Sequence, residues 1–100
     1  MAAMTTYRFP AELWLHSEMP GAWCFATLPL DAADEIRASH ERRGFGSVRI
    51  RAVIGKTEWA TSVFPDTKSG SFLLPVKAAV RQAEAIDGGD TVEVTLTTDP

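Results

Sequence analysis

Hydrophobic and polar residues alternate along much of the chain, and a period of two is typical of β-strands. The alternation is clearest over residues 7–15, 48–54 and 91–97, where every second residue is apolar. Shorter apolar segments bounded by turn residues predict further strands. We therefore expect six strands, over residues 7–15, 22–28, 48–54, 58–64, 71–75 and 91–97.

Turn residues join two pairs of these strands into hairpins. Residues 18–21, with the sequence EMPG, predict a turn between the first two strands. Gly55 and Lys56 stand where a two-residue turn joins the third strand to the fourth. In the first strand, Pro10 removes a backbone donor and indicates a sheet edge or a bulge. We expect one face of that strand to carry Tyr7, Phe9, Ala11, Leu13 and Leu15, and one face of the last strand to carry Val92, Val94 and Leu96.

Two segments have the spacing and the end signals of short helices. In the first, Asp31 is placed to cap the N-terminus and Gly44 to stop the C-terminus. Its apolar face is thin, which predicts a surface helix. The second covers residues 76–86 and follows Pro75, a favoured residue of a first helical turn. The first helix has Arg42 and Arg43 near its end and the apolar residues Ala32, Ala33 and Ile36. In the second, the residues at helical spacing are Val76, Ala79, Val80, Ala83 and Ile86.

Glycines follow the second helix instead of preceding it. Gly88 and Gly89 permit the positive φ angles needed to leave the helix, and Asp90 is placed to hydrogen-bond the turn. A phosphate-binding loop needs a helix N-terminus at the ligand, and here Pro75 occupies that end. Many short strands with two helices predict a mainly β fold, a small closed or nearly closed barrel of about six strands capped by two short α-helices. One hundred residues make a single domain, 1–100.

Composition and charge exclude several classes of protein. The chain is 45% hydrophobic and 23% charged, as in ordinary globular domains, which excludes a disordered or fibrous protein. A net charge of −3 disfavours a uniformly basic surface that coats nucleic acid. Neither a transmembrane segment nor a secretory signal is evident. Cys24 is the single cysteine, so no internal disulfide forms, and we expect a cytoplasmic protein without a membrane partner.

The most specific motifs of the chain lie in its second half. They are Ser62-Val63-Phe64-Pro65, Leu74-Pro75-Val76-Lys77, Val80-Arg81 and Gly89-Asp90-Thr91-Val92. With them, the chain from about residue 7 to residue 96 resembles a small bacterial family, domain of unknown function 1905. That family is similar in fold to a double-split, pseudo-closed β-barrel, which implies the same architecture here. It has no established activity, so the resemblance implies no catalytic residues.

Residues 75–94 show a more distant likeness to a second group of proteins. Pro75, the helix with Val80-Arg81, and the segment from Gly89 to Val94 resemble the swapped-hairpin motif of AbrB-like and MazE-like regulators. Those regulators are DNA-binding homodimers, so the likeness implies a nucleic-acid-binding alternative. The same residues also encode a compact structural unit without any binding role.

Four basic residues form the best candidate for a binding cluster. Arg49 and Arg51 share the outer face of the third strand, and Lys77 and Arg81 are four residues apart on the second helix. If the helix lies near the strand, the cluster suits phosphates or carboxylates. Otherwise these cations are solvated or paired with acidic residues. The acidic residues available for pairing are Glu58, Glu84 and Glu93.

Three tryptophans are many for a chain of this length. We expect Trp23 in the core. Trp14 falls on the polar side of its strand, and Trp59 lies on the hairpin that carries the arginines. Either residue suits a stacking platform or a protein interface, and packing beneath a helix explains both equally well.

Catalytic and metal-binding signals are weak. Ser62 and Thr61 lack the surroundings of a nucleophile elbow, and His16 and His40 have no evident carboxylate partner. The histidines and Cys24 do not have the spacing of a metal site. The glycines match neither a Walker loop nor a dinucleotide fingerprint. We therefore assign no catalytic residue, metal or cofactor.

The sequence favours a binding module without catalysis, for a small ligand or a protein partner. A nucleic-acid-binding regulator is the alternative, and an enzyme of unknown class is third. We expect a monomer or a homodimer. The predicted binding residues are Arg49, Arg51, Trp59, Ser62, Lys77 and Arg81.

Overall fold

The computed structural model describes residues 5–17, 22–39 and 46–98, which form six strands and two helices. The expected turn at 18–21, His40, and the helix end with Arg42, Arg43 and Gly44 lie outside these residues. The elements in chain order are β1 (Thr6–Leu15), β2 (Cys24–Thr27), α1 (Leu30–Ser39), β3 (Val48–Ile54), β4 (Thr57–Asp66), β5 (Ser71–Pro75), α2 (Ala78–Glu84) and β6 (Thr91–Thr98). All six predicted strands and both helices are confirmed.

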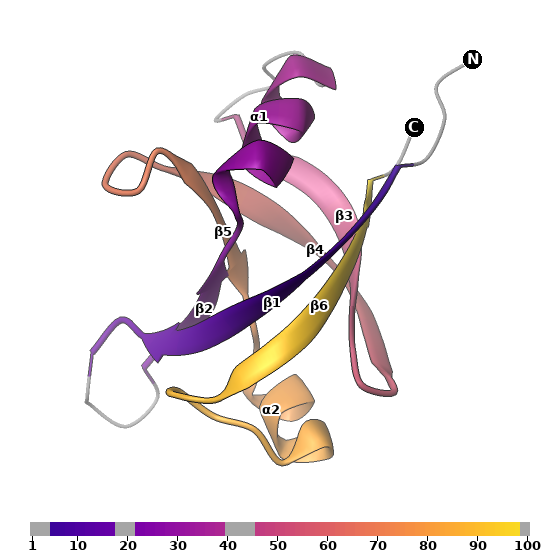
Figure 1. Cartoon of the computed structure of the whole chain (residues 1–100). Coiled ribbons are helices and arrows are strands. Elements are labelled where there is room, and N and C mark those ends of the chain that lie inside the picture. The colour runs from indigo at the N-terminus through magenta and orange to yellow at the C-terminus, as the bar shows by residue number, and fades with distance from the viewer. Residues whose placement is uncertain (1–4, 18–21, 40–45, 99–100) are drawn as a thin grey trace.

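The strands close into an antiparallel barrel in the order β1-β2-β5-β4-β3-β6 (Figure 1). This confirms the predicted mainly β, closed barrel. Two long strands, β1 and β4, change neighbours along their length. β1 pairs with β6 over residues 6–12 and with β2 over 13–15. β4 pairs with β3 over residues 57–63 and with β5 over 64–66. The barrel therefore has two halves that share only β1 and β4.

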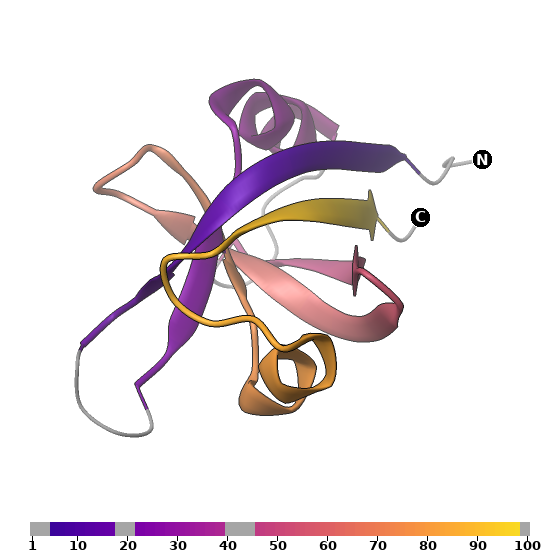
Figure 2. The same cartoon turned by 60° about the horizontal axis from the view of Figure 1, so that its bottom comes forward.

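The two helices lie at opposite ends of the barrel (Figures 1 and 2). α1 packs against β5, and its buried face consists of Ala32, Ala33 and Ile36, as the sequence predicts. The helix begins at Leu30, so Asp31 is not the residue before the first turn. Its Oδ1 instead accepts a hydrogen bond from the Ala32 amide at 2.9 Å. α1 is thus a thin amphipathic cover for one end of the barrel.

α2 is shorter than the spacing of apolar residues predicts. It begins at Ala78 because Lys77 is still extended, and it ends where Ala85 adopts a left-handed conformation with φ of 55°. Only Val80 of this helix is buried, whereas Ala79 and Ala83 are exposed. The chain therefore leaves the helix at an alanine and not at the glycines. Gly89, with φ of 94°, belongs to the following turn, where Asp90 accepts the expected side-chain hydrogen bond, from the Asp87 amide at 2.8 Å.

Glu84 anchors the end of α2 to the β3–β4 hairpin. Its Oε2 accepts hydrogen bonds from Thr57 Oγ1 at 2.6 Å and from the Lys56 amide at 3.2 Å. Gly55 is required beside it, because φ is 60° there and an added Cβ would overlap the Glu84 carboxylate. The predicted two-residue turn at Gly55 and Lys56 is confirmed.

Pro10 lies where β1 has a strand on one side only. The Leu13 amide donates to Asp90 O at 2.8 Å, and Leu13 O accepts from the Gly89 amide at 2.7 Å. Backbone groups alternate in direction along a strand, so the even-numbered residues of β1 face away from β6. No described strand pairs with residues 6–12 on that side. The expected edge position is confirmed, and the continuous register with β6 excludes the expected bulge.

The core is formed by alternate residues of every strand. The inward positions predicted for β1 and β6 are buried or half-buried, with the exception of Leu15. Leu15 is exposed because β1 runs past the end of the barrel, where its side chain lies against Gly88. The largest fully buried side chains, which come from all parts of the barrel, include Leu13, Ile36, Ile50, Leu74, Leu96, Val63, Val76, Val80 and Val94.

Candidate ligand-binding surfaces

The structure does not combine the four predicted cations into one cluster. Arg49 and Arg51 are exposed on the outer face of β3, where Arg49 lies opposite Ser62 on β4. Arg51 Nη1 lies 3.6 Å from Glu58 Oε2. This ion pair agrees with the alternative in which the arginines pair with acidic residues.

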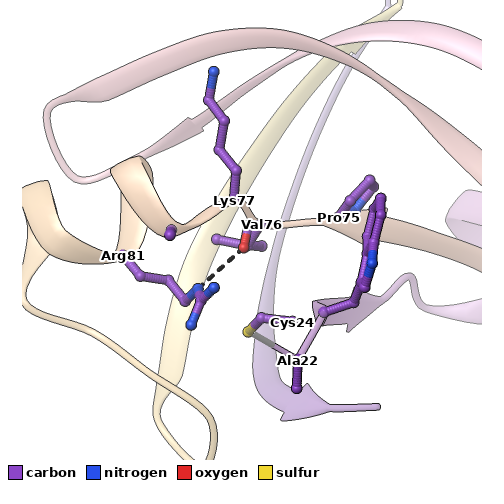
Figure 3. A pocket seen from close by; sticks show the side chains of 8 residues that line it. Ala22, Cys24, Pro75, Val76, Lys77 and Arg81 are labelled. Atoms are coloured by element: carbon purple, nitrogen blue, oxygen red, sulfur yellow. Dashed lines mark hydrogen bonds between the residues drawn. The ribbon is translucent and has the colours of Figure 1, made fainter. Parts of the chain in front are cut away.

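Lys77 and Arg81 have different environments, although both were expected on one helical face. Lys77 is extended and precedes α2, so helical spacing does not apply to it. Figure 3 shows its side chain extending away from the Arg81 guanidinium. Arg81 donates from Nε to Val76 O at 3.2 Å and from Nη1 to Asp87 Oδ1 at 3.2 Å. Arg81 therefore fastens α2 to the segments on either side of it.

Trp23 does not lie in the core, where the sequence predicts it, whereas Trp59, for which the sequence left a surface and a packed position open, does. Trp59 is 7% exposed and faces the core, opposite the small, fully buried Ala52, so it forms no exposed stacking platform. Trp23 is 64% exposed, which contradicts its expected place in the core. The reason is alternation: Cys24 begins β2 with its side chain inward, so its neighbour Trp23 faces outward.

Aromatic side chains continue from Trp23 along the outer face of β2 and β1. Trp23 stacks on Phe25 with ring centroids 6.0 Å apart and an angle of 14° between the rings. Phe25 also contacts Trp14, its cross-strand neighbour, at 5.1 Å. Trp14 Nε1 donates to Thr27 Oγ1 at 2.9 Å, which fixes the indole against the sheet. The ring order is thus Trp23, Phe25, Trp14 across two strands.

These rings form one wall of a surface hollow of about 620 Å³, which we call the aromatic groove. Phe64 of β4, which is 44% exposed, and its cross-strand neighbour Leu73 of β5 supply the opposite side. The residues of the groove are Trp14, His16, Trp23, Phe25, Phe64, Asp66, Thr67, Lys68 and Leu73. The groove therefore spans the outer face of the β1-β2-β5-β4 half of the barrel.

The lining of the groove also includes polar and charged residues. The hydrogen bond from Ser69 Oγ to Asp66 Oδ2, 2.8 Å long, lowers the pKa of the Asp66 carboxyl. Asp66 also accepts from the Ser69 amide at 3.1 Å. His16 and Lys68 are the other ionisable residues of the lining. A mainly apolar lining with a few polar groups is the usual composition of a small-molecule site.

None of the groove residues is among the predicted binding residues, although the sequence offered Trp14 as one alternative for a stacking platform or a protein interface. The sequence predicts Trp14 on the polar side of its strand. Alternation over residues 58–64 is a signal that could also have placed Phe64 on the outer face of the barrel. What the sequence does not reveal is that β2 and β5 lie between these two strands. Without that order, two outward aromatic residues 50 positions apart give no signal of a shared surface.

A second, smaller cavity of about 270 Å³ lies between β2 and α2 (Figure 3), and we call it the α2 cavity. Its lining is mostly apolar and includes the predicted residues Lys77 and Arg81. The residues that line it are Ala22, Trp23, Cys24, Pro75, Val76, Lys77, Ala78 and Arg81. Trp23 lies between the two hollows and lines both.

The residues that the structure describes contain no group of three or more His, Cys, Asp and Glu side chains placed to hold a metal ion. In the same part of the chain, no helix has the length and apolar character needed to cross a membrane.

Comparison with known protein families identifies the chain. The model of a family described as domain of unknown function, DUF1905, matches residues 9–96. The chain belongs to the DUF1905 family. No curated protein matches it. Because DUF1905 is defined without an activity, membership confirms the expected family and assigns no ligand, so a function has to be argued from the surfaces of the barrel.

Proposed function

We propose that this DUF1905 domain is a binding module without catalysis, and that its aromatic groove binds a small, planar, largely apolar molecule. The observation that carries the proposal is the exposure of Trp23 and Phe64 on one continuous outer face. An antiparallel sheet with one face on the core normally has polar residues on the other. Contiguous exposed apolar residues rimmed by polar groups are typical of binding surfaces.

The dimensions of the groove favour a small ligand. Small-molecule sites have volumes of about 300–1,000 Å³, and the groove has about 620 Å³. Its lining includes four aromatic side chains, and aromatic rings pack well against planar molecules. Lys68 and His16 of the lining supply contacts for a polar substituent.

The nucleic-acid-binding alternative has weaker support. Swapped-hairpin regulators bind DNA as homodimers, and this barrel closes within one chain. The exposed arginine at position 51 already pairs with Glu58. We expect a cytoplasmic protein, because its only cysteine is buried and unpaired. A homodimer remains an alternative occupant of the groove and is an outcome of the test below.

Titration with 1-anilinonaphthalene-8-sulfonate, a planar aromatic probe, tests the proposal. The probe's fluorescence should rise in the folded wild-type protein, and the affinity should fall at least about fivefold in Trp23→Ser and Phe64→Ser, since each removes a stacking face. Leu30→Ser is the matched control, because Leu30 is 58% exposed on α1 and does not line the groove.

Two results would overturn the proposal. One is equal probe binding in the wild type and both groove variants. The other is a concentration-dependent dimer, seen by light scattering, that Trp23→Ser dissociates, because the groove would then be occupied by a second copy of the chain. Circular dichroism of each variant checks that the barrel remains folded.

A further inference from the structure

The α2 cavity combines apolar walls with one guanidinium group. Trp23, Pro75, Val76 and Ala78 supply the apolar surface, and Cys24 closes the inner side. Figure 3 shows the Arg81 side chain reaching from α2 toward Cys24, with its guanidinium beside the Val76 carbonyl. A guanidinium beside apolar walls offers a ligand both charged hydrogen-bond donors and an apolar packing surface.

Arg81 is held in place with part of its hydrogen-bonding capacity unused. Its side chain is 19% exposed, and the bonds to Val76 O and Asp87 Oδ1 engage Nε and Nη1. Among the residues that the structure describes, Nη2 of Arg81 donates to no protein atom. A guanidinium presents its donors in a rigid, planar fork, so fixing Nε and Nη1 also fixes the direction in which Nη2 donates.

The other titratable groups nearby leave this donor available. Burial raises the pKa of the Cys24 thiol, so the thiol is uncharged at neutral pH and offers no competing anion. Asp87 balances part of the positive charge, but its side chain is 70% exposed and engages Nη1 only. Lys77 lines the cavity and adds a second positive charge at its border.

From this geometry we infer that the α2 cavity binds a small organic carboxylate. The carboxylate group accepts hydrogen bonds from Arg81 Nη2, and the apolar body of the ligand packs against Trp23 and Pro75. Arginine is well suited to this role, since charge-assisted hydrogen bonds to carboxylates are the strong ones. Size also agrees: a cavity of about 150 Å³ already accommodates benzene, and this one has about 270 Å³.

This site is separate from the aromatic groove and does not depend on the function proposed for the groove. The two hollows share Trp23 as a wall, but only the α2 cavity is lined by Arg81 and only the groove is lined by Phe64. Variants at Arg81 and Phe64 therefore test the two proposals independently.

Benzoate and its neutral analogue benzamide are the probes, and side-chain NMR of Arg81 Nε–H with Trp23 Nε1–H is the readout. Both resonances should shift on titration with benzoate. Benzoate should bind at least about tenfold more tightly than benzamide, because a hydrogen bond to a charged acceptor is stronger than one to a neutral acceptor. Arg81→Gln should weaken benzoate binding by a similar factor, whereas Arg51→Gln, which removes an exposed cation elsewhere, should leave it unchanged.

A second variant keeps the test decisive if Arg81→Gln does not fold. Ala78→Leu fills the cavity and leaves the hydrogen bonds of Arg81 intact, so it should abolish the benzoate-induced shifts. Phe64→Ser should leave the benzoate-induced shifts unchanged, whereas it should weaken binding of 1-anilinonaphthalene-8-sulfonate to the aromatic groove. Equal affinity for benzoate and benzamide, no shift in the wild type, or full benzoate binding in both Arg81→Gln and Ala78→Leu would overturn the inference.

Discussion

The two halves of the barrel have the same kind of inner face and opposite kinds of outer face. In the half made with β6 and β3, the outer face carries ion pairs, such as Arg8–Glu93 at 4.0 Å and Arg51–Glu58 at 3.6 Å. In the half made with β2 and β5, the outward positions include a contiguous set of aromatic and aliphatic residues, namely Trp14, Phe25, Phe64 and Leu73. Closing the barrel requires apolar residues only on the inside, so the fold does not explain the apolar exterior of the second half.

The strands shared by both halves show where the change occurs. β1 has exposed Arg8 where it pairs with β6 and half-buried Trp14 where it pairs with β2. β4 has exposed Glu58 beside β3 and exposed Phe64 beside β5. The surface chemistry changes at the point where each strand changes neighbour. This coincidence supports a binding role for one half and a solvated role for the other.

The largest effect should distinguish the buried Trp59 from the exposed Trp23. Trp59→Ala removes a core side chain and should lower the free energy of unfolding by about 3–5 kcal/mol. Trp23→Ala removes an exposed one and should cost less than about 1 kcal/mol. Urea denaturation followed by circular dichroism measures both. A loss for Trp23→Ala as large as that for Trp59→Ala would show that the aromatic exterior is part of the core.

The turns of the two halves provide the next comparison. Gly55 and Gly70 both have positive φ, 60° and 74°, but an added Cβ meets the Glu84 carboxylate at Gly55 and nothing within 4 Å at Gly70. Gly70→Ala should cost about 1 kcal/mol from backbone strain alone. Gly55→Ala should cost about 2–3 kcal/mol, because it also displaces the hydrogen bonds of Glu84. Equal losses in thermal denaturation would contradict the anchoring role of Glu84.

Replacing the more buried of two arginines should also lower the free energy of unfolding more than replacing the exposed one, with smaller losses than at the glycines. Arg81 is largely buried and makes two hydrogen bonds, so Arg81→Ala should lower the free energy of unfolding by about 1–3 kcal/mol. Arg51 forms an exposed ion pair, and Arg51→Ala should cost between about 0 and 1 kcal/mol. Chemical denaturation at low and high salt tests this, since the contribution of the more exposed Arg51–Glu58 pair should fall more steeply with salt than that of Arg81. A larger loss of stability for Arg51→Ala than for Arg81→Ala would contradict the structural role assigned to Arg81.

The smallest effect concerns pH. Hydrogen bonds from Ser69 to Asp66 and from the Gly88 amide to Asp87 lower the pKa of both carboxyls below their ordinary value of 3.8. The unfolded chain therefore takes up protons first, so the stabilisation is complete above pH 3.8 and is lost as pH falls through the lower, folded-state values. Melting temperatures between pH 7 and pH 2 should fall more steeply in the wild type than in a variant with Asp66→Asn and Asp87→Asn. The same dependence of melting temperature on pH in both proteins would contradict a stabilising role for these two carboxylates.

Much of the fold followed from local patterns, and much of the site did not. Alternation located three strands and short apolar segments between turn residues located the others. Gly55 located a hairpin, and Ala33 and Ile36 located the buried face of α1. Trp23 was misplaced because it stands one residue before β2, where hydrophobicity alone does not give direction. The shared face expected for Lys77 and Arg81 failed because the helix begins after Lys77. Errors thus fell at the ends of elements, where tertiary contacts fix the backbone.

The sequence by itself determined the strands, their inward residues and the family, because these depend on neighbours a few positions apart. Only the tertiary structure decided which outward residues share a surface. Phe64 meets Leu73 and Trp14 meets Phe25 because β2 and β5 lie between β1 and β4. Arg81 reaches the β2 side because α2 closes the end of the barrel there. Both candidate sites therefore depend on strand order, which is set by long-range pairing and not by local pattern.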